Sequence, residues 1–133
     1  MKLLITGSRK FDNYEALKNA IEEIETLQKI KITILLHGGA IGADALAQRW
    51  ADENKILTQI IKPDYKNYKN KIAPLIRNQE LVKLAECTLA LYVKNRTGGT
   101  WYTSQETIKA NKPLYEYLGT EKLIYTPPVK MLF

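Results

Sequence analysis

Three glycine-containing turns follow apolar, strand-like runs in this sequence, and each could bind an anion. They are Thr6-Gly7-Ser8-Arg9, His37-Gly38-Gly39-Ala40-Ile41-Gly42-Ala43-Asp44 and Thr97-Gly98-Gly99-Thr100. A strand, a glycine turn and a helix start present free backbone N–H groups and a positive helix end to a phosphate. The sequence therefore predicts a phosphate-bearing ligand. The backbone contacts that we expect for it are Gly7, Gly38, Gly39, Ala40, Gly42, Thr97, Gly98, Gly99 and Thr100.

The central turn differs from two common phosphate-binding fingerprints. Its spacing is G-G-x-x-G, whereas the dinucleotide fingerprint is G-x-G-x-x-G, and no Lys-Ser or Lys-Thr follows as in a P-loop. The alternative interpretation is that these glycines only allow a sharp turn from strand to helix. If they cradle a phosphate, Gly39→Val should abolish binding, because a branched side chain would fill the phosphate space.

Polar side chains beside the turns could complete such a site. Ser8 could donate to a phosphate oxygen and Arg9 could bind one bidentately. Asp44 falls in the first turn of the second helix, opposite its apolar face, where it could bind ribose hydroxyls, act as an acid or base, or simply cap the helix. Arg77 and Asn78 lie in an otherwise apolar stretch and could reach the cleft, unless Arg77 forms a surface ion pair.

For the remaining candidates, residues of these types are more often structural than ligand-binding. His37, at a strand end, could face the ligand or stay structural. Trp101 could stack on a base or pack in the core, and Tyr65 and Tyr68 could stack or lie on a loop surface. With one histidine and one cysteine, we expect no metal site and no resident cofactor.

Alternating apolar patterns must position these residues. Strands are predicted at 2–6, 32–36, 56–61, 88–93 and 113–117, and helices around the apolar positions 17–27 and over 43–53, 72–86 and 100–111. Such alternation favours an α/β, Rossmann-like doubly wound fold, with a mostly parallel sheet of five or slightly more strands and helices on both faces. In that fold the carboxyl ends of the strands meet at one cleft, where ligands bind.

Composition limits the other possibilities. The 133 residues fit one domain, placed at residues 1–120, with a tail at 121–133 that packs on the domain or on a partner subunit. The net charge of +6 suits an anionic ligand, but the lysines are spread along the chain. No apolar run is long enough for a bilayer or a signal peptide. The single Cys87 fits a reducing cytoplasm.

Four motifs together resemble the SLOG superfamily of Rossmann-like nucleotide-binding domains, in the small branch related to YspA and YpsA. They are Gly7-Ser8-Arg9, Gly38-Gly39-Ala40-Ile41-Gly42-Ala43-Asp44, Ala73-Pro74-Leu75-Ile76-Arg77-Asn78 and Gly99-Thr100. The resemblance implies a nucleotide-derived ligand, similar to ADP-ribose and including cyclic forms. It also implies a sensor or a sequestering sponge, conceivable in phage–host conflict, and a homo-oligomer fits the fold.

Some members of the superfamily are phosphoribohydrolases, which makes an N-glycosidase the alternative. Their late motif reads P-G-G-x-G-T-x-x-E, with the glutamate acting at the ribose. Here Thr97 stands at the proline and Thr103 at the glutamate, and Glu106 lies one turn further. The catalytic candidates are therefore Asp44, Arg77 and Glu106. Nucleic acid ranks last among partners, because no basic stripe or aromatic platform is evident.

Overall fold

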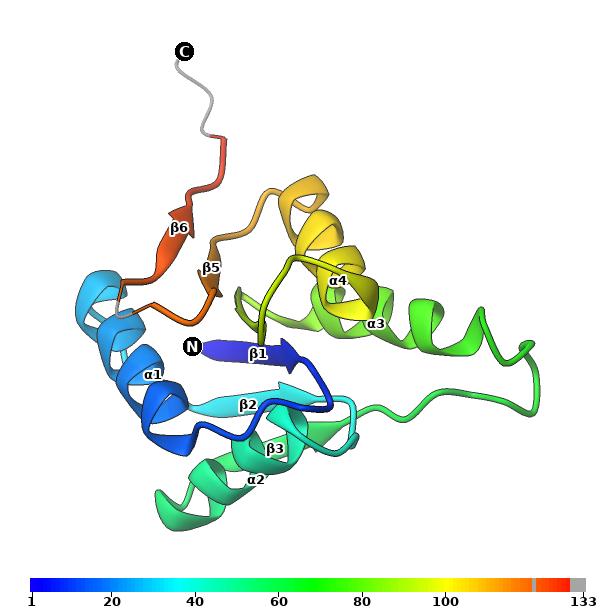
Figure 1. Ribbon diagram of the computed structural model, residues 1–133, viewed down its shortest axis with the longest axis horizontal. Coiled ribbons are helices and arrows are strands. Elements are labelled where there is room, and N and C mark those ends of the chain that lie inside the picture. Colours follow the sequence, from blue (N-terminus) through cyan, green and yellow to red (C-terminus); the bar gives the residue numbers. More distant parts are fainter. Residues whose placement is uncertain (121, 130–133) are drawn as a thin grey trace.

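The computed structural model describes residues 1–120 and 122–129, and it has alternating strands and helices. The elements are β1 (Lys2–Gly7), α1 (Tyr14–Gln28), β2 (Ile34–His37), α2 (Ala43–Glu53), β3 (Leu57–Ile60), α3 (Ala73–Leu84), β4 (Cys87–Leu91), α4 (Gly98–Lys109), β5 (Leu114–Tyr117) and β6 (Ile124–Thr126). Figure 1 shows their arrangement around one central sheet. The predicted doubly wound α/β architecture is confirmed.

The sheet has the strand order β3-β2-β1-β4-β5-β6, with β6 antiparallel to β5 and all other pairs parallel. The chain winds outward from β1 to β3, then crosses back to β4 and winds the other way. The carboxyl ends of β1 and β4 therefore form the topological switch point, where folds of this kind bind ligands. Strand β6 lies within the predicted tail and extends the sheet by one edge strand. Within that tail, residues 121 and 130–133 lie outside the described residues.

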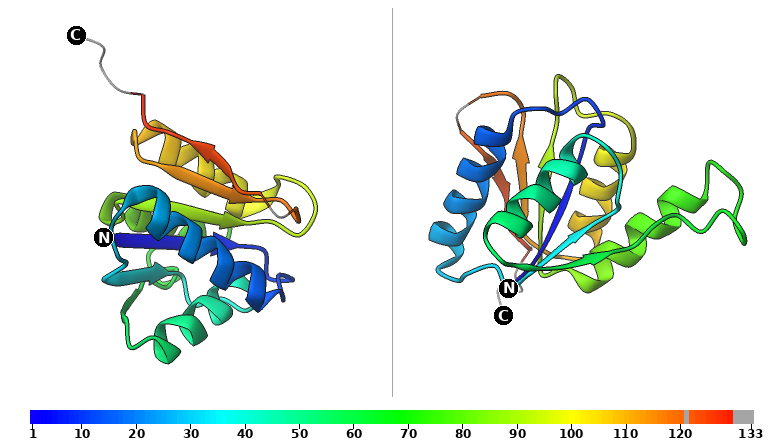
Figure 2. Two further views of the ribbon diagram at one scale, coloured as in Figure 1. Left: turned by 90° about the vertical axis from the view of Figure 1, so that its left-hand side faces the viewer. Right: turned by 90° about the horizontal axis from the view of Figure 1, so that it is seen from below.

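Two helices cover each face of the sheet (Figures 1 and 2). Helices α1 and α2 bury the larger apolar cluster, whose spacing along α1 has the period of a helix: Leu17, Ala20, Ile21 and Ile24. Helix α3 packs Leu81 and Val82 on Leu4 and Leu36 of the opposite face. Leu27, predicted on the apolar face of α1, is 56% exposed. None of the described helices is long and apolar enough to cross a membrane.

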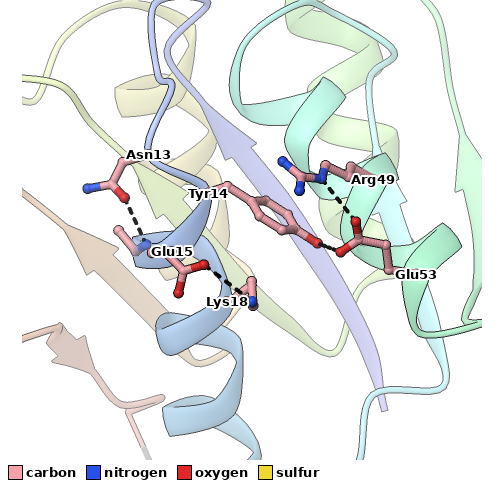
Figure 3. A network of polar contacts seen from close by, with 7 residues as sticks. Asn13, Tyr14, Glu15, Lys18, Arg49 and Glu53 are labelled. Carbon is pink, nitrogen blue, oxygen red and sulfur yellow. Dashed lines mark hydrogen bonds and ion pairs between the residues drawn. The ribbon is translucent and has the colours of Figure 1, made fainter.

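The contact between α1 and α2 includes a polar network at the surface (Figure 3). The Tyr14 hydroxyl donates to Glu53 Oε1 (2.5 Å), and the Arg49 guanidinium lies over the Tyr14 ring, 3.9 Å from its centroid. Burial, followed by the Glu53 hydrogen bond, raises the pKa of Tyr14 to about 12. Asn13 caps α1 by accepting from the Ala16 amide with its side-chain oxygen.

Residues 62–72, which we call the arm, project from the body between β3 and α3 (Figures 1 and 2). Every residue from 64 to 72 is exposed. The arm keeps a defined shape at Asp64, whose Oδ1 accepts from the amides of Lys66 and Asn67. The arm is longer than most connections between a strand and a helix in compact domains.

Candidate ligand-binding site

A cavity of about 800 Å³ opens at the switch point, beside the carboxyl end of β1. It is large enough for a nucleotide-sized ligand. Twelve of the predicted ligand contacts line it, from all three turns and from α3: Gly7, Ser8, Arg9, Gly38, Ala40, Asp44, Arg77, Asn78, Thr97, Gly98, Gly99 and Thr100. The folded chain thus brings together four segments that are far apart in the sequence.

Close backbone packing joins the first two turns. The Ser8 carbonyl accepts from the amides of Phe11 and Ala43, 3.1 Å each. A Cβ at Gly42 would collide with the Arg9 carbonyl, and the φ of Gly42 is +75°. Gly42 is therefore needed where α2 begins against the first turn, and it does not line the cavity.

Asp44 holds the central turn in shape. Its Oδ2 accepts from the amides of Gly38 and Ala40, 3.1 Å each. Asp44 is 7% exposed, in contrast to the expected position opposite the apolar face. Burial raises the pKa of the Asp44 carboxyl, although the amide hydrogen bonds and the charge of Arg77 oppose this. Oδ1 makes no hydrogen bond with the described residues and is not fully buried, so one oxygen of this cavity-lining carboxylate can still meet a ligand.

Arg77 connects α3 to the same turn rather than forming a surface ion pair. Its Nη1 donates to the carbonyls of Gly38 (2.8 Å) and Ile61 (3.4 Å), and its Nε donates to Asn78 Oδ1 (2.7 Å). Burial lowers the pKa of the Arg77 guanidinium, and the charge of Asp44 opposes this shift. These bonds use Nε and Nη1 of the guanidinium and the oxygen of the Asn78 amide. They leave Arg77 Nη2 and Asn78 Nδ2 without hydrogen-bond partners in the described part of the chain.

The N-terminus of α4 supplies the clearest anion-binding group. The helix begins at Gly98, two residues before the predicted start, so both late glycines lie in its first turn. The cap residue Thr97 makes no side-chain hydrogen bond to the helix, which leaves the first-turn amides free to bind a ligand. A Cβ at Gly99 would have only Asn78 Nδ2 nearby, at 3.8 Å. The space in front of these amides is therefore open.

The side chains around the cavity carry a positive balance. Four cationic residues line it: Arg9, Lys10, Arg77 and Lys94. Asp44 is the one carboxylate among the described lining residues. Positive charge beside free amides favours a ligand with more than one negative charge.

Lys10 and Lys94 were not singled out from the sequence, because isolated lysines in a lysine-rich chain give no positional signal. Arg96 was also missed. It binds Glu116 bidentately (2.9 and 3.2 Å) and so anchors the loop from Val93 to Thr97 to β5. Glu116 is 4% exposed. Its position within a strand is the one feature of the sequence that distinguishes it from the other carboxylates.

Other candidates lie away from the cavity lining. His37 is the last residue of β2 and is 2% exposed. Its Nδ1 accepts from the Gly39 amide (3.0 Å), so Nε2 carries the proton and donates to Gln48 Oε1 (2.7 Å). His37 is thus a structural part of the turn. A Cβ at Gly39 would meet Ile60 Cγ2 at 3.1 Å, so Gly39→Val would strain the turn instead of filling the phosphate space.

The two late candidates on α4 are also displaced. Trp101 is 41% exposed but does not line the cavity, so it neither stacks there nor packs in the core. Glu106 does not line the cavity either, and it lies near Tyr102, whose pKa is raised first by burial and then by the Glu106 carboxylate. Thr103, at the position of the hydrolase glutamate, donates to the Gly99 carbonyl (2.9 Å). The cavity therefore lacks a carboxylate on its α4 side.

Comparison with known proteins assigns the family. Residues 1–68, about half of the chain, match the model of the YspA, cpYpsA-related SLOG family (YAcAr). The chain is also 27% identical over 121 residues to the Gene 61 protein of Mycobacterium phage D29, covering 87% of this chain and 95% of that protein. The family match includes the first two turns and Asp44 but ends before α3 and α4. The chain belongs to the YspA, cpYpsA-related SLOG family.

Proposed function

We propose that this protein binds a phosphate-bearing, nucleotide-derived small molecule, similar to ADP-ribose and including cyclic forms, in the cavity at the switch point. The observation that carries the proposal is the open N-terminus of α4, which faces the cavity beside Asn78 and Arg77. Free first-turn amides and a guanidinium are the groups that phosphate oxygens prefer. Family membership supports a nucleotide-related ligand.

Binding without turnover accounts best for the side chains present. Cleavage of an N-glycosidic bond needs a carboxylate that can stabilise a positively charged ribose. Asp44 is the one carboxylate among the described lining residues, and one of its oxygens already holds two amides. The protein would then act in the cytoplasm as a sensor or as a sponge that sequesters a signalling nucleotide. The similarity to a phage protein is compatible with a role in phage–host conflict.

An N-glycosidase is the second candidate, because Asp44 Oδ1 can still meet a ligand. The two functions differ in their products, because binding leaves the nucleotide intact and a glycosidase cleaves it. A nucleotide panel should be incubated with the native protein and analysed by mass spectrometry, alongside the small molecules released when freshly purified protein is denatured. An intact nucleotide-like species and an unchanged panel would support binding. Free base and ribose 5-phosphate would support the glycosidase.

The proposed binding can be tested before the ligand is identified. Isothermal titration calorimetry with inorganic pyrophosphate measures the affinity of the anion-binding groups alone. The same measurement with ADP gives the affinity when a nucleoside is also present. Failure of both probes to bind at low ionic strength would contradict the proposal. The expected homo-oligomer is a separate prediction, which light scattering on the eluting protein would check.

A further inference from the structure

In the described part of the chain, the cavity provides donors for phosphate but no exposed aromatic ring for a base. Among the described residues, its aromatic lining is Tyr92, which is 2% exposed and whose hydroxyl pairs with Ser104 Oγ (2.8 Å). Trp101 lies outside the lining. Proteins commonly hold unpaired bases by stacking them on aromatic rings. A ring for the base must therefore come from beside the cavity.

The arm is the segment in a position to supply it. At its first root, the Ile61 carbonyl accepts from Arg77 Nη1. At its second root, Pro74 and Leu75 of α3 line the cavity. The first root thus contacts a residue that lines the cavity and the second root lines it directly. The arm projects from the body of the domain between these two roots (Figures 1 and 2). Because no side chain from 64 to 72 is buried, the arm can lean towards the cavity without breaking core contacts.

Of the two tyrosines on the arm, Tyr65 lies nearer in the sequence to the first root of the arm. Its ring is 53% exposed, and it follows Asp64, whose side chain fixes the turn of the arm through Lys66 and Asn67. Tyr65 lies four residues after Ile61, whose carbonyl accepts from Arg77 Nη1. Tyr68 lies further from the first root of the arm and closes the same turn with its amide bonded to the Asp64 carbonyl (3.1 Å).

We infer that Tyr65 stacks on the base of a nucleotide whose phosphates occupy the cavity. Tyr65 would supply the part of the affinity that depends on the base, while the α4 amides and Arg77 would supply the part that depends on phosphate. This inference rests on the proposed function. It makes the arm the element that distinguishes a nucleotide from a simple polyphosphate. It also predicts weak discrimination among bases, because every base has a face that can stack.

The test compares Tyr65→Ser and Tyr65→Phe with Tyr68→Ser, a matched control on the same arm. Each variant is titrated with inorganic pyrophosphate and with ADP, GDP, CDP and UDP. We expect Tyr65→Ser to lose about five- to 150-fold in affinity for the nucleoside diphosphates, the range for loss of one base–aromatic stack. Its affinity for pyrophosphate should stay unchanged. Tyr65→Phe, which keeps the ring, and Tyr68→Ser should both bind like wild type.

Each of the other outcomes gives a definite answer. Unchanged nucleotide affinity in Tyr65→Ser would overturn the inference and leave the proposed function standing. Equal losses for pyrophosphate and nucleotides would also overturn it, because Tyr65 would then act on the phosphate site. A loss in Tyr68→Ser alone would assign the stacking to Tyr68 instead. If wild type binds neither pyrophosphate nor any nucleotide, the proposed function fails and this inference fails with it.

Discussion

Gly99→Ala should change folding stability and ligand binding in opposite directions. Gly99 lies in the first turn of α4 with an ordinary backbone conformation, and its added Cβ would have only Asn78 Nδ2 nearby, at 3.8 Å. Alanine fits this position without strain and reduces the entropy of the unfolded chain. We therefore expect unfolding to cost about 0.4–1 kcal/mol more than in wild type. For a domain of this size, that corresponds to a melting temperature about 2–5 °C higher.

We expect the same methyl group to crowd a phosphate oxygen bound at the α4 amides. The added carbon would lie 3.8 Å from Asn78 Nδ2 and so would share the space beside this donor with an oxygen bonded to it. Loss of one charge-assisted hydrogen bond costs about 1.5–3 kcal/mol, or about ten- to 150-fold in affinity. Calorimetry with pyrophosphate measures this loss, and thermal unfolding monitored by circular dichroism measures the stability.

Gly98→Ala is the matched control for the effect on stability. No atom lies within 4 Å of its added Cβ, but the φ of Gly98 is +69°, so alanine should lower the stability by about 1–2 kcal/mol. The reasoning would be refuted if Gly99→Ala were more stable than wild type yet bound pyrophosphate with unchanged affinity. A less stable Gly99→Ala would refute the assignment of open space at this position.

Three further substitutions test the surroundings of the site. Asp44→Asn keeps an oxygen for the two turn amides and removes a buried charge, so it should fold at neutral pH and bind pyrophosphate more tightly than wild type. Asp44→Ala removes that oxygen and should lose about 1–3 kcal/mol of stability, measured by urea denaturation. Weaker pyrophosphate binding by a folded Asp44→Asn would contradict the view that Asp44 only supports the turn. Arg96→Met leaves the buried Glu116 carboxylate unpaired, so the stability should fall by about 1–3 kcal/mol and the affinity for pyrophosphate should decrease. Adding Glu116→Gln to this variant should restore the stability. Burial and the Glu53 hydrogen bond raise the pKa of Tyr14 from 10 to about 12 on folding, so the folded state holds this proton longer than the unfolded chain and loses stability as the pH rises from 10 through 12. Tyr14→Phe should therefore remove one late step from the ultraviolet titration of the tyrosines and lessen the loss of stability over that range.

The sequence by itself determined the order of the elements and the position of the cleft. Apolar runs of strand length alternate with helical patterns, and a chain that alternates in this way forms a parallel sheet whose carboxyl ends share one edge. Each glycine turn follows a strand, so the meeting of Gly7, Gly38 and Gly99 could be predicted without coordinates. The predicted Arg77-Asn78 pair also reached the cavity, because its helix begins near that edge.

Side-chain direction was decided only by the tertiary structure. The sequence predicted that a side chain at Gly39 would point into the ligand space, whereas a Cβ at this position would face Ile60. The sequence does not reveal this direction, because the backbone dihedral angles of a turn depend on contacts made elsewhere. His37 and Asp44 occupy neighbouring positions of the same turn, yet the first is enclosed by Gln48 and Gly39 while the second keeps one oxygen towards the cavity.

Partners that are distant in sequence were equally beyond prediction. The anchoring of Arg96 by Glu116 and of Arg77 by the Gly38 carbonyl depends on which strand and which turn the fold places opposite them. The spacing of residue types along a chain reports local periodicity, because the backbone of a helix or a strand repeats at a fixed number of residues. It carries no information on which of many lysines, arginines and carboxylates will share a cavity, and that choice is made by packing.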